Sequence, residues 1–138
     1  PASGGVEKIE GTGNEYFLGA QLIGNGIFSR ADVTILSLRR GVAQRYKDFT
    51  FSLNNRFPLS GRTWRINPII QYNRRESSIN SDVRDTTRLS LKVEYKPSRT
   101  MQLESRIGIE NSHEKVLDQA ISSETFFFYA GYRWDFKL

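Results

Sequence analysis

One stretch of the sequence decides the fold: Phe126-Phe127-Phe128-Tyr129-Ala130-Gly131-Tyr132-Arg133-Trp134-Asp135-Phe136. Its even-numbered residues are all apolar or aromatic, and its charged residues fall only in the odd-numbered set. This period of two predicts a β-strand with one apolar face and one face that tolerates charge. A tilted strand that crosses a membrane needs about 9–11 residues, and this stretch is long enough. Aromatic residues at its end are typical of strands that stop at the interface between bilayer and water.

Part of this stretch resembles the C-terminal signal of bacterial outer-membrane β-barrels. The resemblance rests on Tyr129, Gly131, Trp134 and Phe136, in the spacing Tyr-x-Gly-x-x-Trp-x-Phe. It implies a closing strand that the barrel-assembly machinery reads during insertion, and a location in the outer membrane of a Gram-negative bacterium. The chain departs from the family's pattern because Lys137 and Leu138 follow the last Phe. We interpret residues 137–138 as a remnant of cloning.

Earlier segments repeat the alternation, and no segment has a helical period. We predict an all-β fold, an antiparallel transmembrane β-barrel of eight strands that occupies residues 6–136 after a linker at residues 1–5. The weakest strand is expected at residues 6–10. Asn55 is the one polar residue among the otherwise apolar alternate positions of its strand. Pro68 predicts a bulge or weak pairing because proline has no backbone N–H to donate to the neighbouring strand. The other seven strands are predicted at residues 15–24, 27–40, 46–57, 64–73, 87–95, 101–110 and 126–136.

Composition limits the class of protein. Hydrophobic residues make up 38% of the chain and charged residues 25%, and no apolar run of about 18 residues exists, which excludes a helical membrane protein. The chain has no cysteine, so disulfides and thiolate metal sites are absent. Its net charge of +5 is too diffuse to predict a nucleic-acid partner. We expect no cofactor.

The predicted connections alternate in length. Turns at residues 24–26, 58–61 and 96–99 are short, whereas polar segments at 40–45, 74–85 and 111–124 are longer. Short periplasmic turns and long extracellular loops are the outer-membrane arrangement. The strand directions that follow predict a periplasmic aromatic girdle that includes Trp134 and Phe136, and an opposite girdle. The further girdle residues are Phe57, Trp64 and Tyr95 at the first end, and Tyr72 and Phe126 at the second.

The charged side chains, which alternate with the apolar ones along each strand, would point into the barrel. An eight-stranded barrel is filled by side chains, so these charges must pair with one another. We therefore expect a lumen filled by ion pairs rather than an open pore. The charges concerned are Arg56, Arg65, Arg88, Lys92, Glu94, Glu104, Arg106, Glu110, Arg133 and Asp135.

A second set of basic residues maps to the outer rim, where the phosphates of lipopolysaccharide lie. Contacts to those phosphates and ordinary solvation of loops are equally good readings on charge grounds. The set comprises Arg39, Arg40, Arg45, Lys47, Arg74, Arg75 and Arg84. No catalytic or metal site is predicted, because the one histidine, His113, lies in a polar segment next to Ser112, and neighbours on a strand point to opposite faces.

The expected role is structural, anchoring or surface-binding, with outer-membrane lipid and lipopolysaccharide as partners. Two alternatives remain open. The chain is also consistent with the C-terminal part of a larger transport or export barrel joined to a periplasmic domain or partner. A soluble, lipocalin-like barrel would alternate as well, but with its apolar face inward, and residues 15–24 lack the Trp expected of a lipocalin's first strand.

Overall fold

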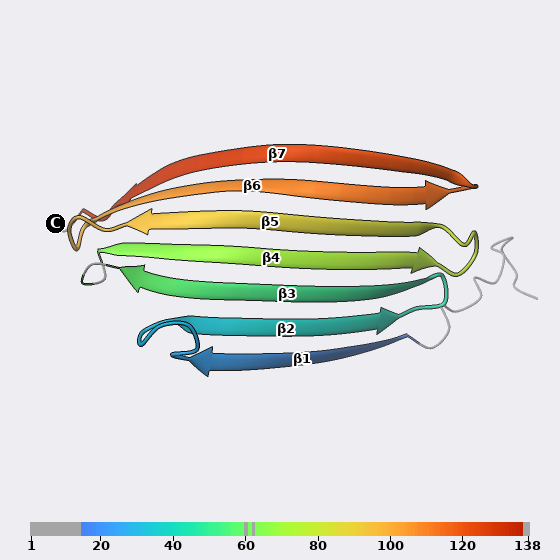
Figure 1. Cartoon of the computed structure of the whole chain (residues 1–138), viewed down its shortest axis with the longest axis horizontal. Helices are drawn as coiled ribbons and strands as arrows, with labels where there is room; N and C mark the ends of the chain where they lie inside the picture. The colour runs from blue at the N-terminus through green and yellow to red at the C-terminus, as the bar shows by residue number, and fades with distance from the viewer. Residues whose placement is uncertain (1–14, 60, 62, 137–138) are drawn as a thin grey trace, which may run out of the picture.

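The computed structural model describes residues 15–59, 61 and 63–136, which form a single antiparallel sheet of seven strands in the order β1-β2-β3-β4-β5-β6-β7 (Figure 1). Each strand is hydrogen-bonded to the next in sequence, so every connection is a hairpin. The eighth strand expected at residues 6–10 lies outside the described residues. The strands are β1 (Tyr16–Asn25), β2 (Val33–Val42), β3 (Tyr46–Leu59), β4 (Trp64–Ser77), β5 (Val83–Tyr95), β6 (Met101–Val116) and β7 (Gln119–Trp134).

The predicted alternation of loop lengths is wrong. The segments 74–85 and 111–124 are largely strand, because β4 and β5 pair out to Glu76 and Val83, and β6 and β7 pair out to Val116 and Gln119. The connections at that end are residues 43–45, 78–82 and 117–118, whereas the end expected to carry the shortest turns has residues 26–32, 60–63 and 96–100. The polar segments therefore lengthen the sheet instead of forming loops.

The hairpin between β6 and β7 turns on two residues in the left-handed region, Leu117 at φ 48° and Asp118 at φ 63°. Positive φ at both central residues is the backbone of a two-residue turn that matches the twist of its flanking strands. Asn-Gly or Asp-Gly usually marks such a turn, and Leu-Asp does not, so the sequence pattern did not identify it.

Strand pairing divides the side chains into two faces. One row across all strands consists of aliphatic and aromatic residues, and we call its side of the sheet the apolar face; the other side is the polar face. The defining row is Leu22, Leu36, Leu53, Ile70, Leu89, Ile109 and Phe126. In β2 aliphatic residues occur on both parities, and the pairing places Leu36 and Leu38 on the apolar face and Val33 and Ile35 on the polar face.

The apolar face has no second layer over it in the described part of the chain. Ala43 is the one hydrophobic residue there that is buried, whereas Leu18, Phe126 and Phe128 each expose 70% or more of their surface. A soluble domain normally covers such a face with another sheet or with helices. The described residues therefore contain no hydrophobic core of the usual kind.

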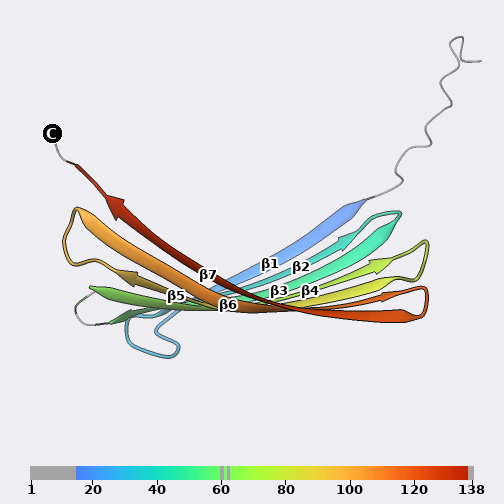
Figure 2. The ribbon, with the colours of Figure 1, turned by 90° about the horizontal axis from the view of Figure 1, so that it is seen from above.

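The sheet is open, which corrects the expectation of a closed barrel for the described residues. β1 and β7 are its two border strands, and five strands separate them (Figure 1). Seen along the sheet, the strands fan out with a strong twist (Figure 2). Because seven consecutive antiparallel strands alternate in direction, β1 and β7 run the same way, and direct pairing between them would be parallel.

Pro68 weakens its pairing with β3 without shifting the register. The β3–β4 ladder has partners on either side of the gap, Asn54 with Ile69 and Phe57 with Ile66, in one continuous register. On its other edge Pro68 still lies opposite Leu91 of β5. The missing donor thus costs local hydrogen bonding, and no bulge forms.

Candidate functional site

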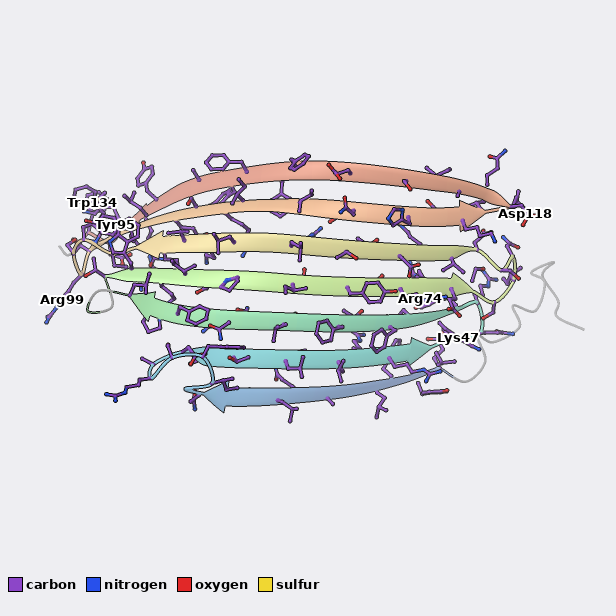
Figure 3. All side chains as sticks on the ribbon, in the orientation of Figure 1. Lys47, Arg74, Tyr95, Arg99, Asp118 and Trp134 are labelled. Atoms are coloured by element: carbon purple, nitrogen blue, oxygen red, sulfur yellow. The ribbon has the colours of Figure 1, made fainter. Side chains whose placement is uncertain are left out.

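The candidate site is the sheet itself, with an apolar band on one face and a charged surface on the other. The end of the sheet that carries Tyr95 and Trp134 is here called the aromatic end, and the opposite end, with Lys47, Arg74 and Asp118, the charged end (Figure 3). Trp64 pairs with Tyr95 and so belongs to the aromatic end. In β4 the band runs from Trp64 to Tyr72 and gives way to Arg74 and Glu76. These are nine residues, or about 27 Å along a strand.

The border of the band slants across the strands. Toward the charged end the last apolar residue is Tyr16 in β1, Phe49 in β3, Tyr72 in β4 and Phe126 in β7. Through the pairing of the strands, Phe126 lies level with Leu22, six residues along β1 from Tyr16. The border thus moves by about one residue for each strand, which is about 3.3 Å along the strand direction for each step of about 4.8 Å between neighbouring strands. A level apolar band would need strands tilted by about 35° from its normal.

Aromatic side chains gather at the aromatic end of the apolar face. Trp64 and Tyr95 lie directly opposite each other, and their rings stack with centroids 4.3 Å apart. Trp134 and Phe136 stack at 6.0 Å, although Phe136 itself follows the end of β7. Phe57 lies on the same face at this end. Tyr72 and Phe126 lie at the other border of the band, where the second girdle was predicted.

The polar residue Asn55 is explained by a loop that the sequence did not reveal. Residues 26–32 fold onto the apolar face and bury Asp32, which is only 1% exposed. Its carboxylate accepts hydrogen bonds from Asn55 Nδ2 at 2.7 Å, from Thr34 Oγ1 at 3.2 Å and from the backbone N–H groups of Phe28 and Ser29. These contacts join the loop to β2 and β3.

The surroundings of Asp32 act on its pKa in opposite directions. Burial raises the pKa of the Asp32 carboxyl, whereas the hydrogen bonds from Asn55, from the backbone of Ser29 and Phe28 and from Thr34 lower it. The net pKa lies below the usual value, because the donors together outweigh the burial. The loop buries the carboxylate of Asp32 and exposes Arg30 together with two apolar side chains, Ile27 at 58% and Phe28 at 66%.

The predicted lumenal charges share the polar face, except for Asp135, which follows β7. Lys92 is central to them, since its Nζ lies 2.8 Å from both Glu94 and Glu104. Glu94 is 7% exposed and also accepts from Arg65 at 3.1 Å. Of the remaining charges, Arg88 pairs with Glu110, and Arg133 pairs with Asp135 at 2.9 Å. Within the described residues no carboxylate lies within 4.0 Å of Arg56 or Arg106.

Aromatic residues on the polar face cover glycines of the neighbouring strand. Phe127 lies over Gly108, where an added Cβ would come within 2.3 Å of its ring, and Phe17 lies over Gly41, where the distance to the ring would be 2.9 Å. Tyr129 lies along its own strand over Gly131, so these two residues of the C-terminal signal are in contact. Covering a glycine with a ring restores packing that the missing side chain cannot supply.

The middle of the polar face is hollowed. The hollow has a volume of about 520 Å³ and extends over β3 to β7. Its lining is mainly hydroxyl, amide and guanidinium groups, with one aromatic ring. The lining residues are Ser52, Asn54, Ile69, Gln71, Arg88, Ser90, Arg106, Glu110, Thr125 and Phe127.

The seven predicted rim residues divide between the two faces. Arg40, Lys47 and Arg74 lie on the apolar face, on three adjacent strands, and line one small pocket at the border of the band, which Asp48 and Glu76 also line. Arg74 contacts Glu76 at 2.8 Å, whereas Arg40 and Lys47 have no ion pair among the described residues. Arg45 is in a turn, and the remaining members, Arg39, Arg75 and Arg84, lie on the polar face.

His113 lies within β6, not in a loop, and its Nδ1 shares a hydrogen bond with Ser122 Oγ at 2.7 Å. Ser112 belongs to the opposite face and hydrogen-bonds to Arg84. Among the described residues, no three His, Cys, Asp or Glu side chains are grouped in a way that could hold a metal ion. The same part of the chain has no helix that is long and apolar enough to cross a membrane.

Comparisons with known proteins give no relative: no protein-family model, no curated protein and no solved structure matches the chain.

Proposed function

We propose that the chain is a wall of an integral β-barrel in the bacterial outer membrane, with its apolar face toward lipid and its polar face toward the interior. The observation that carries the proposal is the exposed apolar band, about 27 Å long in β4. Contiguous apolar surface of that extent on a soluble monomer is rare, and lipid is the partner that such a band fits.

The inverted distribution of polar groups supports the same orientation. Charges pair on the polar face around Lys92, whereas Ala43 is the one buried hydrophobic residue in the described part. A soluble lipocalin-like barrel would close around its apolar side chains instead. The loop at residues 26–32 also presents two apolar side chains outward, Ile27 and Phe28, beside the exposed Arg30.

The dimensions also support a membrane. Outer-membrane barrels have an apolar band about 25 Å tall and strands tilted by about 35–45°. A strand segment of about 27 Å, tilted by the 35° that the slanted border requires, has a height of about 22 Å. Band length is a property of β4 and the slant is a property of the register between strands, and together they give a height close to that of such a band, which supports the proposal.

The surface-binding role rests on three cations that border the lipid-facing band. Arg40, Lys47 and Arg74 lie where lipid headgroups would lie, so we propose that they bind the phosphates of lipopolysaccharide. Replacing all three by Gln should weaken binding of lipopolysaccharide micelles at least tenfold at low salt. The matched control replaces Arg39, Arg75 and Arg84, which carry the same charge at the same end but on the polar face. Equal losses in both triple variants would contradict the assignment.

The orientation can be tested with single cysteines, because the chain has none of its own. Ile70→Cys and Gln71→Cys place a fluorescent label on the apolar and the polar face of β4 at nearly the same depth. In vesicles that contain lipids with spin-labelled acyl chains, the label at residue 70 should be quenched strongly and that at residue 71 weakly. Equal quenching, or folding of the chain in buffer without detergent, would refute the proposal.

A second candidate function is that this sheet is part of a larger transport or export barrel. It is favoured by the two unpaired borders, because β1 and β7 run in the same direction and antiparallel closure needs an odd number of additional strands between them. A self-closed barrel migrates faster on a gel before boiling than after. The larger-barrel candidate predicts no such shift for this chain in micelles, and a compact fast band would exclude it.

A further inference from the structure

We propose that the hollow in the polar face is a binding site for a hydroxylated organic anion, such as an acidic sugar. This inference rests on the proposed function only for the placement of the polar face inside a barrel. The position of the hollow is the first support for the inference. Two small side chains, Ser52 and Ser90, form its floor near the middle of the sheet. The volume of about 520 Å³ is that of a small-molecule site.

The charge of the hollow favours an anion. Arg88 and Glu110 neutralise each other, and the two carboxylates of Glu94 and Glu104 are balanced by Lys92, which contacts both, and by Arg65, which contacts Glu94. Arg106 lies directly opposite Lys92 and has no carboxylate within 4.0 Å among the described residues. One guanidinium is therefore left over in the lining, and a guanidinium fork fits a carboxylate, sulfate or phosphate group.

The remaining lining favours hydroxyl groups on the same ligand. Gln71 and Asn54 offer amide donors and acceptors, and Thr125 adds a hydroxyl. The Oδ1 atom of Asn54 is buried and has no hydrogen-bond partner in the described structure, so it is an acceptor without a donor. Phe127 gives the hollow one flat apolar wall, which suits the apolar face of a sugar ring better than a bare inorganic ion.

The test is calorimetric titration of the chain, folded in detergent micelles, with trigalacturonate, maltotriose and inorganic sulfate. Trigalacturonate should bind, and Arg106→Gln should weaken it about ten- to hundredfold because a hydrogen-bonded charge is lost. Arg56→Gln is the matched control, since Arg56 is also an arginine of the polar face without an ion pair in the described part but lies outside the hollow. It should leave the affinity unchanged.

A second variant keeps the inference testable if Arg106→Gln fails to fold. Ser90→Leu fills the floor of the hollow without changing its charge, and it should also abolish binding of trigalacturonate. Maltotriose that binds as tightly as trigalacturonate would overturn the need for an anion, and sulfate that competes equally would overturn the need for hydroxyl groups. Failure of the proposed membrane orientation is recognised separately, by the quenching of labels at residues 70 and 71.

Discussion

The slant of the apolar band makes a quantitative prediction about Ala20 and Asn111. These residues lie in one register row of the apolar face, Ala20 in β1 and Asn111 in β6, five strand steps apart. The row is about 24 Å long, and a strand tilt of about 35° inclines it so that its two ends differ in depth by about 14 Å. Ala20 then lies near the middle of the bilayer, whereas Asn111 lies at or beyond its border.

Arginine substitutions at these two positions should therefore differ in cost. An arginine on the lipid face costs about 2–4 kcal/mol at the midplane and about 0–1 kcal/mol near the interface. Ala20→Arg should lower the free energy of unfolding by the first amount and Asn111→Arg by the second. The assay is guanidinium unfolding of each variant in phospholipid vesicles, followed by tryptophan fluorescence, with equal denaturant slopes as the condition for comparison.

The control is the size of the side chain. Ala20→Leu and Asn111→Leu add bulk without charge, and the first should be neutral or stabilising in lipid. If Ala20→Arg and Asn111→Arg cost the same, the row is level and the strands are not tilted in a membrane. If the order is reversed, the apolar face does not meet lipid in the way we propose.

Three further changes test the polar face, the sheet backbone and the buried loop. Lys92→Met should cost about 2–4 kcal/mol of unfolding free energy, since it leaves the buried Glu94 with Arg65 alone; Lys92→Arg should restore most of it. Gly108→Ala should cost about 1–3 kcal/mol because its Cβ would meet Phe127 and the Leu89 carbonyl, whereas Gly19→Ala, with nothing nearer than 3.9 Å, should cost less than about 1 kcal/mol. The lowered pKa of Asp32 adds stability that is complete above the unfolded-state pKa of about 3.9 and is lost as the pH falls through the lower, folded-state pKa. The melting temperature should therefore fall in that acid range, and less so in Asp32→Asn.

The outcomes that would contradict these expectations are distinct. If the Lys92→Met protein, which lacks the charge at position 92, is as stable as the wild type, Glu94 is solvated. Equal effects of alanine at Gly108 and Gly19 would mean that Phe127 moves aside at no cost. An Asp32→Asn protein that loses stability in acid as steeply as the wild type would assign the acid effect to other carboxylates.

The central part of the sheet was predictable because one face is apolar and the other is not. In β4 the alternation over Trp64–Tyr72 has one exception, Ile69 on the polar face, so its apolar parity follows from the sequence. In β2 both faces carry aliphatic residues, Leu36 and Leu38 on one side and Val33 and Ile35 on the other, so the period alone could not choose between them. Alternation along a strand shows which side chains face which way only where the two faces of the sheet meet different environments.

The rest was hidden for physical reasons. The outer parts of β6 and β7 are polar on both faces, as at the neighbours Ser112 and His113, so no period marks them as strand. Their turn at Leu117 uses left-handed backbone without the usual glycine or asparagine. The contact of Asp32 with Asn55 joins residues 23 positions apart, and a polar residue on an apolar parity was the one signal that pointed to it.

The length of the β6–β7 hairpin beyond the apolar band decides what kind of surface it offers. From Ile109 to Val116 the hairpin continues for about 23 Å as paired strand, and Asp118 marks its tip at the far end of the molecule (Figure 3). A flexible loop of the same composition would lose conformational entropy on contact with a binding partner, about 1–2 kcal/mol for each residue that becomes ordered. A hydrogen-bonded ribbon has already lost that freedom when the protein folds. A partner that binds this hairpin therefore meets a fixed array of side chains. The selectivity of the hairpin would depend on the fit between the two surfaces more than on rearrangement of the hairpin.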